Sequence, residues 1–319
     1  MFGGKHFTVG DIKDLSGKVI LITGEANFSP PIKGNTGLGK ESIIQLAKHN
    51  PTHIFLAARN PAKAEEAIQD IKVSVPDAVV TFLKLDLSSL NSVAEAAKEF
   101  NAQSGRLDIL MNNAGIMGVP SGTTQEGFEI QFGTNHLGHA LLTKLLLPKL
   151  ITTSKEHGGD VRIINLSSEG HRLAPAGGIV LDKSKLDGLG NWMGPWRRYG
   201  NSKLANLLHA RELARRYPEV LSVALHPGAI MTDLYKSGKE SSIILKYGVS
   251  FVAPLFFLSI PQGSLNQLWL ATAKKEEIEN GAYYTPVGNL SKGSSYAQDD
   301  ELAKRLWDWT EKELTERGY

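Results

Sequence analysis

The chain has 319 residues, with 35 basic and 33 acidic side chains and a formal net charge of +2. This balance provides no overall attraction to nucleic acid or to an anionic membrane. The chain contains no cysteine, which excludes disulfides, thiolate zinc sites and cysteine nucleophiles.

Short apolar runs alternate with helical patterns along the chain. The apolar runs predict strands at residues 18–23, 53–58, 78–85, 108–111, 160–166 and 220–225. The patterns between them predict helices at residues 39–48, 61–72, 91–103, 127–150 and 196–217. This alternation predicts an α/β fold, a doubly wound Rossmann fold whose parallel sheet has six to seven strands and helices on both faces. Ligands of such sheets bind beyond the carboxyl ends of the strands, so the residues that follow each strand are the candidate site.

Glycines follow the first predicted strand. Gly24 ends that strand, and Gly37 and Gly39 open the next helix. Glycines at such a turn let a pyrophosphate approach the backbone N–H groups, as in a dinucleotide site. Residues 34–40 also fit the G-x-x-x-x-G-K spacing of a nucleoside-triphosphate loop. We reject that reading because Glu41 stands where the motif needs Ser or Thr.

The glycine turn is interrupted by residues 25–33 (EANFSPPIK). Without them the turn is a compact phosphate loop. A surface insertion costs little closure entropy, so this segment either loops away or displaces the amides that would hold phosphate. The sequence leaves both alternatives open.

The second predicted strand ends in Ala58-Arg59, with no acidic residue. An acid at this place binds the ribose 2′-hydroxyl of NAD, whereas a basic group accommodates the 2′-phosphate of NADP. Arg59 therefore favours NADP(H) over NAD(H) as the cofactor.

Further motifs follow the later strands. They are Asp86-Leu87, Asn113-Ala114-Gly115, Ser167-Ser168, Tyr199-x-x-x-Lys203 on a helix, and Pro227-Gly228 followed by Thr232. In this order they resemble the short-chain dehydrogenase/reductase superfamily, and the stretches LAARNPAKAE, FGTNHLGHALLT and YGNSKLANLLHARELARR are similar to its retinol-dehydrogenase-like group, especially fungal members. The chain departs from the pattern in the interrupted glycine turn and in a long gap between Ser168 and Tyr199.

Tyr199 and Lys203 are four residues apart, so a helix places them on one face. A free tyrosine has a pKa near 10, and a neighbouring ammonium lowers it by stabilising the phenolate. The resemblance implies that Tyr199 is the general acid in carbonyl reduction and the base in alcohol oxidation, and that Lys203 also binds the nicotinamide ribose. It implies that Ser168, rather than Ser167, holds the substrate oxygen, and that Asn135 anchors a water that relays protons through Lys203.

The resemblance also implies the contacts with the cofactor. Asp86 and Leu87 lie against adenine, and backbone atoms of Ile230 hold the carboxamide with help from Thr232. The expected cofactor-binding residues are Gly24, Asn35, Gly37, Leu38, Gly39, Arg59, Asp86, Leu87, Asn113, Ala114, Gly115, Tyr199, Lys203, Pro227, Ile230 and Thr232.

Two segments predict an apolar substrate surface. The glycine-rich connection at residues 170–197 holds Trp192 and Trp196, and residues 234–262 include the apolar run 249–260 (VSFVAPLFFLSI). Long loops in compact domains are often lids, although packing in the core is the alternative. We expect one domain over residues 1–319, with these two segments as lids, and a small lipophilic aldehyde, ketone or alcohol as substrate.

The sequence also bears on membrane, metal and subunit contacts. The run 249–260 is shorter than the roughly 20 residues of a spanning helix and residues 1–17 are no signal peptide, so we expect a cytoplasmic protein without a transmembrane span. A peripheral contact with membrane or lipid stays open. His136 and His139 lack a third ligand in the sequence, so a packed helix is preferred to a metal site. The resemblance allows a homodimer or a monomer.

The sequence therefore predicts an NADP(H)-dependent oxidoreductase that interconverts a lipophilic carbonyl compound and its alcohol by hydride transfer. The alternative is a cofactor-sensing or inactive relative that acts as a binding protein, because residues 25–33 interrupt the glycine turn.

Overall fold

The computed structural model describes residues 4–24, 37–156, 159–189, 193–229 and 258–319. Eight strands form one sheet in the order β3-β2-β1-β4-β5-β6-β7-β8. The strands are β1 (Val19–Thr23), β2 (His53–Ala58), β3 (Val80–Lys84), β4 (Ile109–Asn112), β5 (Arg162–Leu166), β6 (Leu221–Leu225), β7 (Tyr283–Thr285) and β8 (Asn289–Ser291). The helices are α1 (Leu38–Ala47), α2 (Pro61–Ser74), α3 (Leu90–Gln103), α4 (Ile130–Phe132), α5 (Gly138–Glu156), α6 (Lys183–Asp187), α7 (Gly194–Arg216), α10 (Ile260–Thr272) and α11 (Asp300–Glu316).

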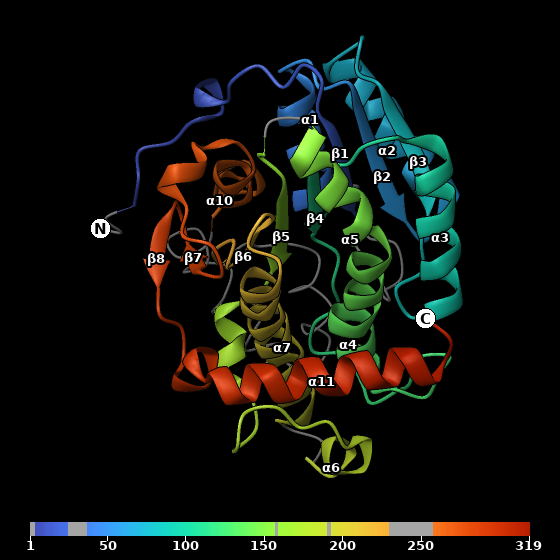
Figure 1. Cartoon of the computed structure of the whole chain (residues 1–319), viewed down its shortest axis with the longest axis vertical. Coiled ribbons are helices and arrows are strands. Elements are labelled where there is room, and N and C mark those ends of the chain that lie inside the picture. The colour runs from blue at the N-terminus through green and yellow to red at the C-terminus, as the bar shows by residue number, and fades with distance from the viewer. Residues whose placement is uncertain (1–3, 25–36, 157–158, 190–192, 230–257) are drawn as a thin grey trace, which may run out of the picture.

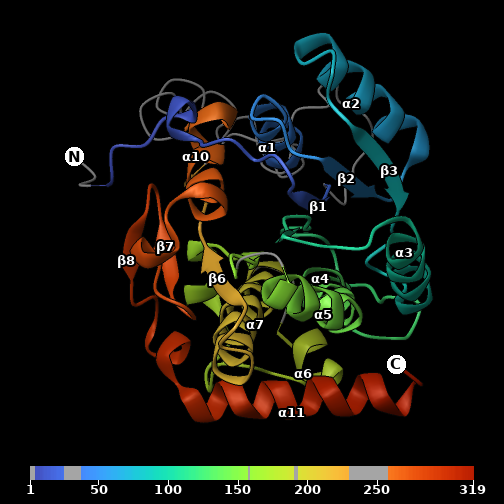
Figure 2. The same ribbon diagram turned by 45° about the horizontal axis from the view of Figure 1, so that its top comes forward.

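The sheet is covered on both faces, and its central strands β1, β4, β5 and β6 are buried at every position. Side chains alternate across a strand, so Ile20 and Ile22 pack with α1, α2 and α10, whereas Val19 and Leu21 pack with α3 and α5 on the opposite face. Figures 1 and 2 show these helix layers on either side of the strands. The predicted doubly wound α/β fold is confirmed.

The sheet differs from the prediction at one edge. The six predicted strands are present, and β7 adds a further parallel strand beside β6. β8 then pairs antiparallel with β7, so the sheet has seven parallel strands, as predicted, and one further antiparallel strand at its edge. Each of these two edge strands spans 3 residues, too short to give a periodic pattern.

The strand order reverses between β1 and β4. The chain winds outward from β1 through β2 to β3, and then crosses back to continue from β4 to β6. Loops that follow β1 and β4 therefore diverge at this point, which is where open α/β sheets bind ligands.

The long helix predicted at residues 127–150 has a different form. It consists of α4, a π-helical turn at Gly133–Leu137 that we call η2, and α5. π-Turns within helices are often found at functional sites, and Asn135 lies in this one.

The C-terminal helix α11 lies across α7 (Figures 1 and 2). Its apolar side buries Leu306 and Trp307, and Trp307 stacks on His209 of α7 with ring centroids 5.2 Å apart. Glu311 also forms an ion pair of 2.9 Å with Lys144 of α5. Helices α5 and α7 thus both contact α11.

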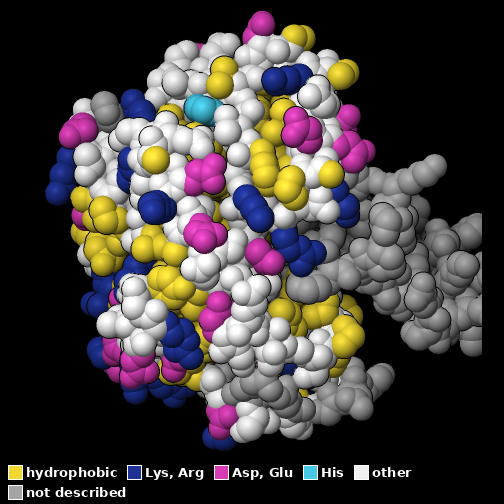
Figure 3. All heavy atoms as spheres, turned by 90° about the vertical axis from the view of Figure 1, so that its right-hand side faces the viewer, with side chains coloured by type: hydrophobic (Ala, Val, Ile, Leu, Met, Phe, Trp, Pro, Cys, Tyr) yellow, Lys and Arg dark blue, Asp and Glu magenta, His cyan; other side chains and the backbone are white. Residues whose placement is uncertain are grey.

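The surface seen in Figure 3 carries acidic and basic side chains interspersed with one another, as a net charge of +2 leads one to expect. Among the described residues, we find no helix with the length and apolarity needed to span a membrane. Most of the apolar run at residues 249–260 lies outside the described residues.

Candidate active site

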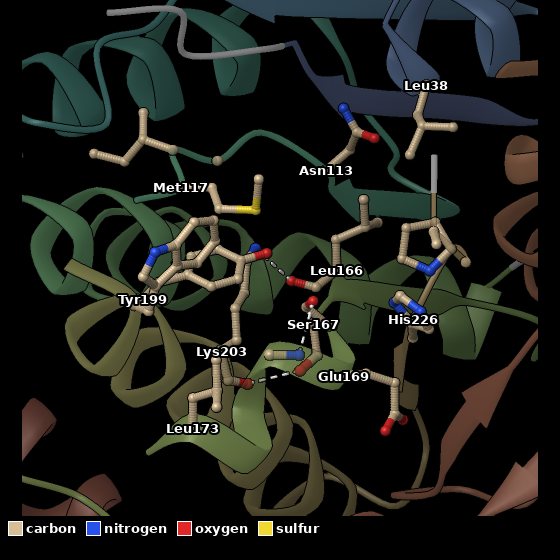
Figure 4. A pocket seen from close by; sticks show the side chains of 18 residues that line it. Leu38, Asn113, Met117, Leu166, Ser167, Glu169, Leu173, Tyr199, Lys203 and His226 are labelled. Atoms are coloured by element: carbon tan, nitrogen blue, oxygen red, sulfur yellow. Dashed lines mark hydrogen bonds between the residues drawn. The ribbon is translucent and has the colours of Figure 1, made fainter. Parts of the chain in front are cut away.

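A cavity of about 320 Å³ opens beyond the carboxyl ends of β4, β5 and β6 (Figure 4). It gathers residues from segments far apart in the sequence. Among the predicted site residues, those that line it are Leu38, Asn113, Gly115, Ser168, Tyr199, Lys203 and Pro227. The fold therefore brings Ser168, Tyr199 and Lys203 to one cavity.

Ser168 and Tyr199 are brought together by two glycines. Ser168 is the N-cap of the short 3-10 turn Glu169–Leu173, and its Oγ accepts a hydrogen bond of 3.0 Å from the backbone N–H of Gly170. A Cβ on Gly170 would lie 2.7 Å from the Tyr199 ring and 3.3 Å from Ser168 Oγ. A Cβ on Gly200 would lie 2.7 Å from backbone atoms of the same turn. Only glycine at these positions allows the turn and helix α7 to approach so closely.

The neighbouring serine has a different environment. Ser167 is only 3% exposed, and its hydroxyl donates a hydrogen bond of 2.7 Å to the backbone carbonyl of Lys203. Ser167 therefore ties β5 to α7, and the turn that follows leaves Ser168 beside Tyr199.

Lys203 lies one helical turn after Tyr199, and its Nζ is 5.8 Å from the centre of the tyrosine ring. The ammonium donates a hydrogen bond of 3.0 Å to the backbone carbonyl of Leu166. Burial lowers the pKa of Lys203 to about 8, because the charged form loses hydration in the protein interior.

Asn135 is held entirely by protein groups. Its Nδ2 donates to the Ile116 carbonyl and to Ser202 Oγ, both at 2.9 Å, and its Oδ1 accepts from the Ile116 N–H at 2.8 Å. A Cβ on Gly115 would lie 3.2 Å from both Asn135 Oδ1 and Lys203 Nζ. The Asn135 amide thus fixes the segment after β4 beside Lys203.

The two histidines near Asn135 have protein partners. His139 Nδ1 donates to the Asn135 carbonyl at 3.0 Å, and its Nε2 lies 3.0 Å from Thr23 Oγ1. His136 Nε2 lies 3.1 Å from Thr310 Oγ1. Burial lowers the pKa of His139 to about 4, so its imidazole is neutral. Both histidines are thus packed between helices and strands.

Most of the described residues that were predicted to bind the cofactor lie near the ends of β1 to β4. Gly37 is the N-cap of α1, and none of the described side chains caps that helix. A Cβ on Gly39 would lie 2.7 Å from Asn113 Nδ2, which donates to the Thr23 carbonyl at 2.8 Å. Gly24, Arg59, Asp86, Leu87 and Ala114 follow their strands as predicted but are not part of the cavity lining.

Some predicted residues lie outside the described residues. They are Asn35, Ile230 and Thr232, together with the insertion at 25–33, Trp192 and most of the segment 234–262. Within the first predicted lid segment, Leu173 and Trp196 line the cavity and are 40% and 37% exposed. They are therefore not packed in the core.

Two polar residues of the cavity were not singled out from the sequence. Glu169 follows Ser168, and His226 precedes Pro227. Tyr283 of β7 donates a hydrogen bond of 2.9 Å to Glu169 Oε1, and burial raises the pKa of that tyrosine. The sequence could have indicated Glu169 and His226, because each is adjacent to a recognised motif at the end of β5 or β6.

Comparison of the chain with known protein families and solved structures indicates the same kind of protein as the fold and the cavity do. The family model for short chain dehydrogenases matches residues 18–186. The chain is 36% identical over 320 residues to the short-chain dehydrogenase/reductase drtF of Aspergillus calidoustus, with 96% of each chain covered. It is also 36% identical over 296 residues to retinol dehydrogenase 12 of Mus musculus, with 92% of this chain and 85% of the relative covered.

A solved structure shows the same fold. The crystal structure of an uncharacterized protein from Mycobacterium paratuberculosis superposes with a TM-score of 0.69 at 28% identity, covering 97% of each chain. The matching family model, the full-length relatives and the sheet topology lead to one conclusion. The chain belongs to the short-chain dehydrogenase/reductase family of oxidoreductases and is similar to its retinol-dehydrogenase-like members.

Proposed function

We propose that the protein is an NADP(H)-dependent oxidoreductase that interconverts a lipophilic aldehyde or ketone and its alcohol. The observation that carries this proposal is the convergence of Ser168, Tyr199 and Lys203 on one cavity. These residues combine a hydroxyl hydrogen-bond donor, a phenol and a buried ammonium, which are the groups that proton transfer to a carbonyl oxygen requires.

Tyr199, Ser168 and Lys203 each have a different role in the proposed reaction. In reduction, the Tyr199 hydroxyl gives its proton to the carbonyl oxygen as negative charge develops there, and in oxidation the phenolate takes a proton from the alcohol. Ser168 Oγ donates a hydrogen bond to the same oxygen. The Lys203 ammonium stabilises the phenolate through its positive charge. A bound nicotinamide supplies or accepts the hydride.

The residues present fit a dinucleotide. Helix α1 has Gly37 as its N-cap and no side-chain cap from the described residues, and the first N–H groups of a helix bind phosphate well. The absence of Cβ atoms at Gly39 and Gly115 keeps space beside Asn113 and Lys203. Lys40, which could assist a 2′-phosphate, is paired with Asp70. The preference for NADP(H) therefore depends on Arg59.

The cavity wall supports a lipophilic substrate. Ile116, Met117, Leu173 and Trp196 line it, and apolar walls with a few polar groups are the usual form of a small-molecule site. The apolar wall continues to the surface at Leu173 and Trp196, which leaves room for a long substrate body.

Replacing Arg59 with alanine is expected to weaken NADPH binding about 10- to 100-fold, because a charge-assisted hydrogen bond to phosphate contributes roughly 1.5–3 kcal/mol. NADH binding is expected to change by less than about twofold, since it has no 2′-phosphate. Fluorescence titration of both cofactors measures this. Lys72→Ala, the same loss of charge at the far end of α2, is the control. Equal weakening of both cofactors would contradict the assignment.

The buried ammonium predicts a pH dependence. A pKa of about 8 for Lys203 means that the ammonium is present below about pH 8 and is lost above it. NADPH affinity is therefore expected to be constant between about pH 7 and 7.5 and to fall as the pH rises past 8. A guanidinium stays charged over this range, so Lys203→Arg is expected to remove the decline. A wild-type affinity that is level up to pH 9.5 would contradict a role of this ammonium in binding.

The direct test is to incubate the protein with NADPH and a panel of lipophilic aldehydes and ketones, and to follow oxidation of the cofactor. We expect the protein to reduce at least one of these carbonyl compounds and to oxidise NADPH. The alternative function, a cofactor-sensing or inactive relative, depends on residues 25–33, which lie outside the described residues. Micromolar binding of NADPH supports the enzyme, whereas absent binding that is restored by deletion of residues 25–33 would support the alternative.

A further inference from the structure

The cavity has two chemically different sides. Figure 4 shows Met117, Tyr199 and Leu173 on one side of the view and Glu169 and His226 on the other. The apolar side accounts for the body of a lipophilic substrate. It leaves a carboxylate and an imidazole, both lining the same cavity as Ser168 and Tyr199, without a role in the reaction proposed above.

His226 presents a neutral imidazole at a fixed position. Its backbone N–H donates to the Tyr284 carbonyl at 2.9 Å, and its carbonyl accepts from Asn266 Nδ2 at 2.8 Å. Burial lowers the pKa of the imidazole to about 4, so at neutral pH the ring carries one N–H and one lone pair.

The hydrogen-bond pattern assigns the proton to Nε2. His226 Nδ1 is enclosed by protein and has no hydrogen-bond partner among the described residues, and the side chain lines the cavity. A buried N–H without a partner is rarer than an unpartnered acceptor. The ring therefore carries its proton on Nε2 and offers the cavity a hydrogen-bond donor.

Glu169 offers an acceptor. Its Oε1 accepts from the Tyr283 hydroxyl at 2.9 Å and its Oε2 from Arg172 Nε at 2.6 Å. Although desolvation by burial opposes it, these hydrogen bonds together lower the pKa of the carboxyl, so Glu169 is ionised. A carboxylate has about four acceptor positions, so these two hydrogen bonds leave capacity for a ligand.

We propose that His226 and Glu169 bind a hydroxyl group of the substrate close to the reacting carbon. A hydroxyl accepts one hydrogen bond and donates another, which matches an imidazole N–H and a carboxylate that line the same cavity. Glu169 is the residue after Ser168, so this hydroxyl lies within a few bonds of the carbonyl that Ser168 and Tyr199 hold. The substrate class is then a lipophilic hydroxy-ketone or hydroxy-aldehyde, with the diol as its reduced form. This inference rests on the proposed function.

The test compares a matched pair of substrates, 1-hydroxyoctan-2-one and octan-2-one, as kcat/KM with NADPH. The wild type is expected to prefer the hydroxy-ketone, and His226→Phe and Glu169→Gln are each expected to lower that preference about 10- to 100-fold, as loss of a hydrogen bond to a substrate hydroxyl does. The difference in intrinsic reactivity of the two ketones cancels, because it is the same for every variant. His226→Gln keeps an N–H near the position of Nε2 and is expected to restore part of the preference.

Leu173→Ala is the matched control on the apolar side. It is expected to lower kcat/KM for both ketones and to leave their ratio unchanged. A His226→Phe ratio equal to that of the wild type overturns the inference, while turnover of octan-2-one keeps the proposed function.

If the wild type reduces neither ketone, calorimetry with the enzyme and NADP⁺ gives the affinities of octane-1,2-diol and octan-2-ol. Tighter binding of the diol that is lost in His226→Phe supports the hydroxyl site, and equal binding of both alcohols overturns it.

Discussion

Tyr199→Phe is expected to lower kcat/KM for carbonyl reduction by about 10²- to 10⁴-fold, the usual contribution of a positioned general acid. The change removes one hydroxyl and keeps the ring that packs on Gly170, so the fold and the turn that carries Ser168 are preserved. NADPH affinity is expected to change by less than about threefold. Steady-state kinetics and a cofactor titration on the same preparation measure both quantities.

Tyr296→Phe is the matched control for this experiment. Its hydroxyl accepts a hydrogen bond of 2.9 Å from the backbone N–H of Gly177, away from the cavity lining. Turnover of this variant is expected to stay within about twofold of the wild type. If Tyr199→Phe kept most of the activity, another group would have to be the acid.

Gly200→Ala is expected to lower both stability and turnover. Alanine favours a helix over glycine by about 1 kcal/mol, but its Cβ would lie 2.7 Å from backbone atoms of Leu173 and Ala174 and 2.8 Å from the Gly170 carbonyl. Backbone cannot give way as a flexible side chain does, so the clash outweighs the gain. We expect a net loss of about 1–3 kcal/mol in the free energy of unfolding.

In Gly200→Ala, the clash between the added Cβ and the backbone of residues 170–174 would move helix α7 away from the turn that carries Ser168. We therefore expect kcat to fall about 10- to 100-fold, since small displacements of reacting groups are costly. Gly105→Ala is the control, because that glycine has no atom within 4 Å of an added Cβ. Urea unfolding and kinetics measure both effects. A stable, fully active Gly200→Ala protein would show that the turn can move without cost.

The sequence determined the strands that build the sheet. Each of the first six strands lies within one or two residues of its predicted bounds, because buried parallel strands are continuous apolar runs. It also indicated the residues at the strand ends, since the chain order of their motifs survives in the sequence. Strands β7 and β8 were not predicted. Each spans 3 residues, and they depend on the pairing of β7 with β6 and of β8 with β7 rather than on a pattern of their own.

Which side chains face one another was decided only by the tertiary structure. The sequence shows Ser167 and Ser168 as equivalent neighbours, and packing of β5 on α7 bonds the first to the Lys203 carbonyl while the turn places the second beside Tyr199. The partners of the Asn135 amide likewise come from segments distant in the chain. His226 and Glu169 line the same cavity because the carboxyl ends of β5 and β6 adjoin. Local sequence determines where the chain becomes a strand or a helix, but burial, protonation and hydrogen-bond partners arise only when distant segments exclude water together.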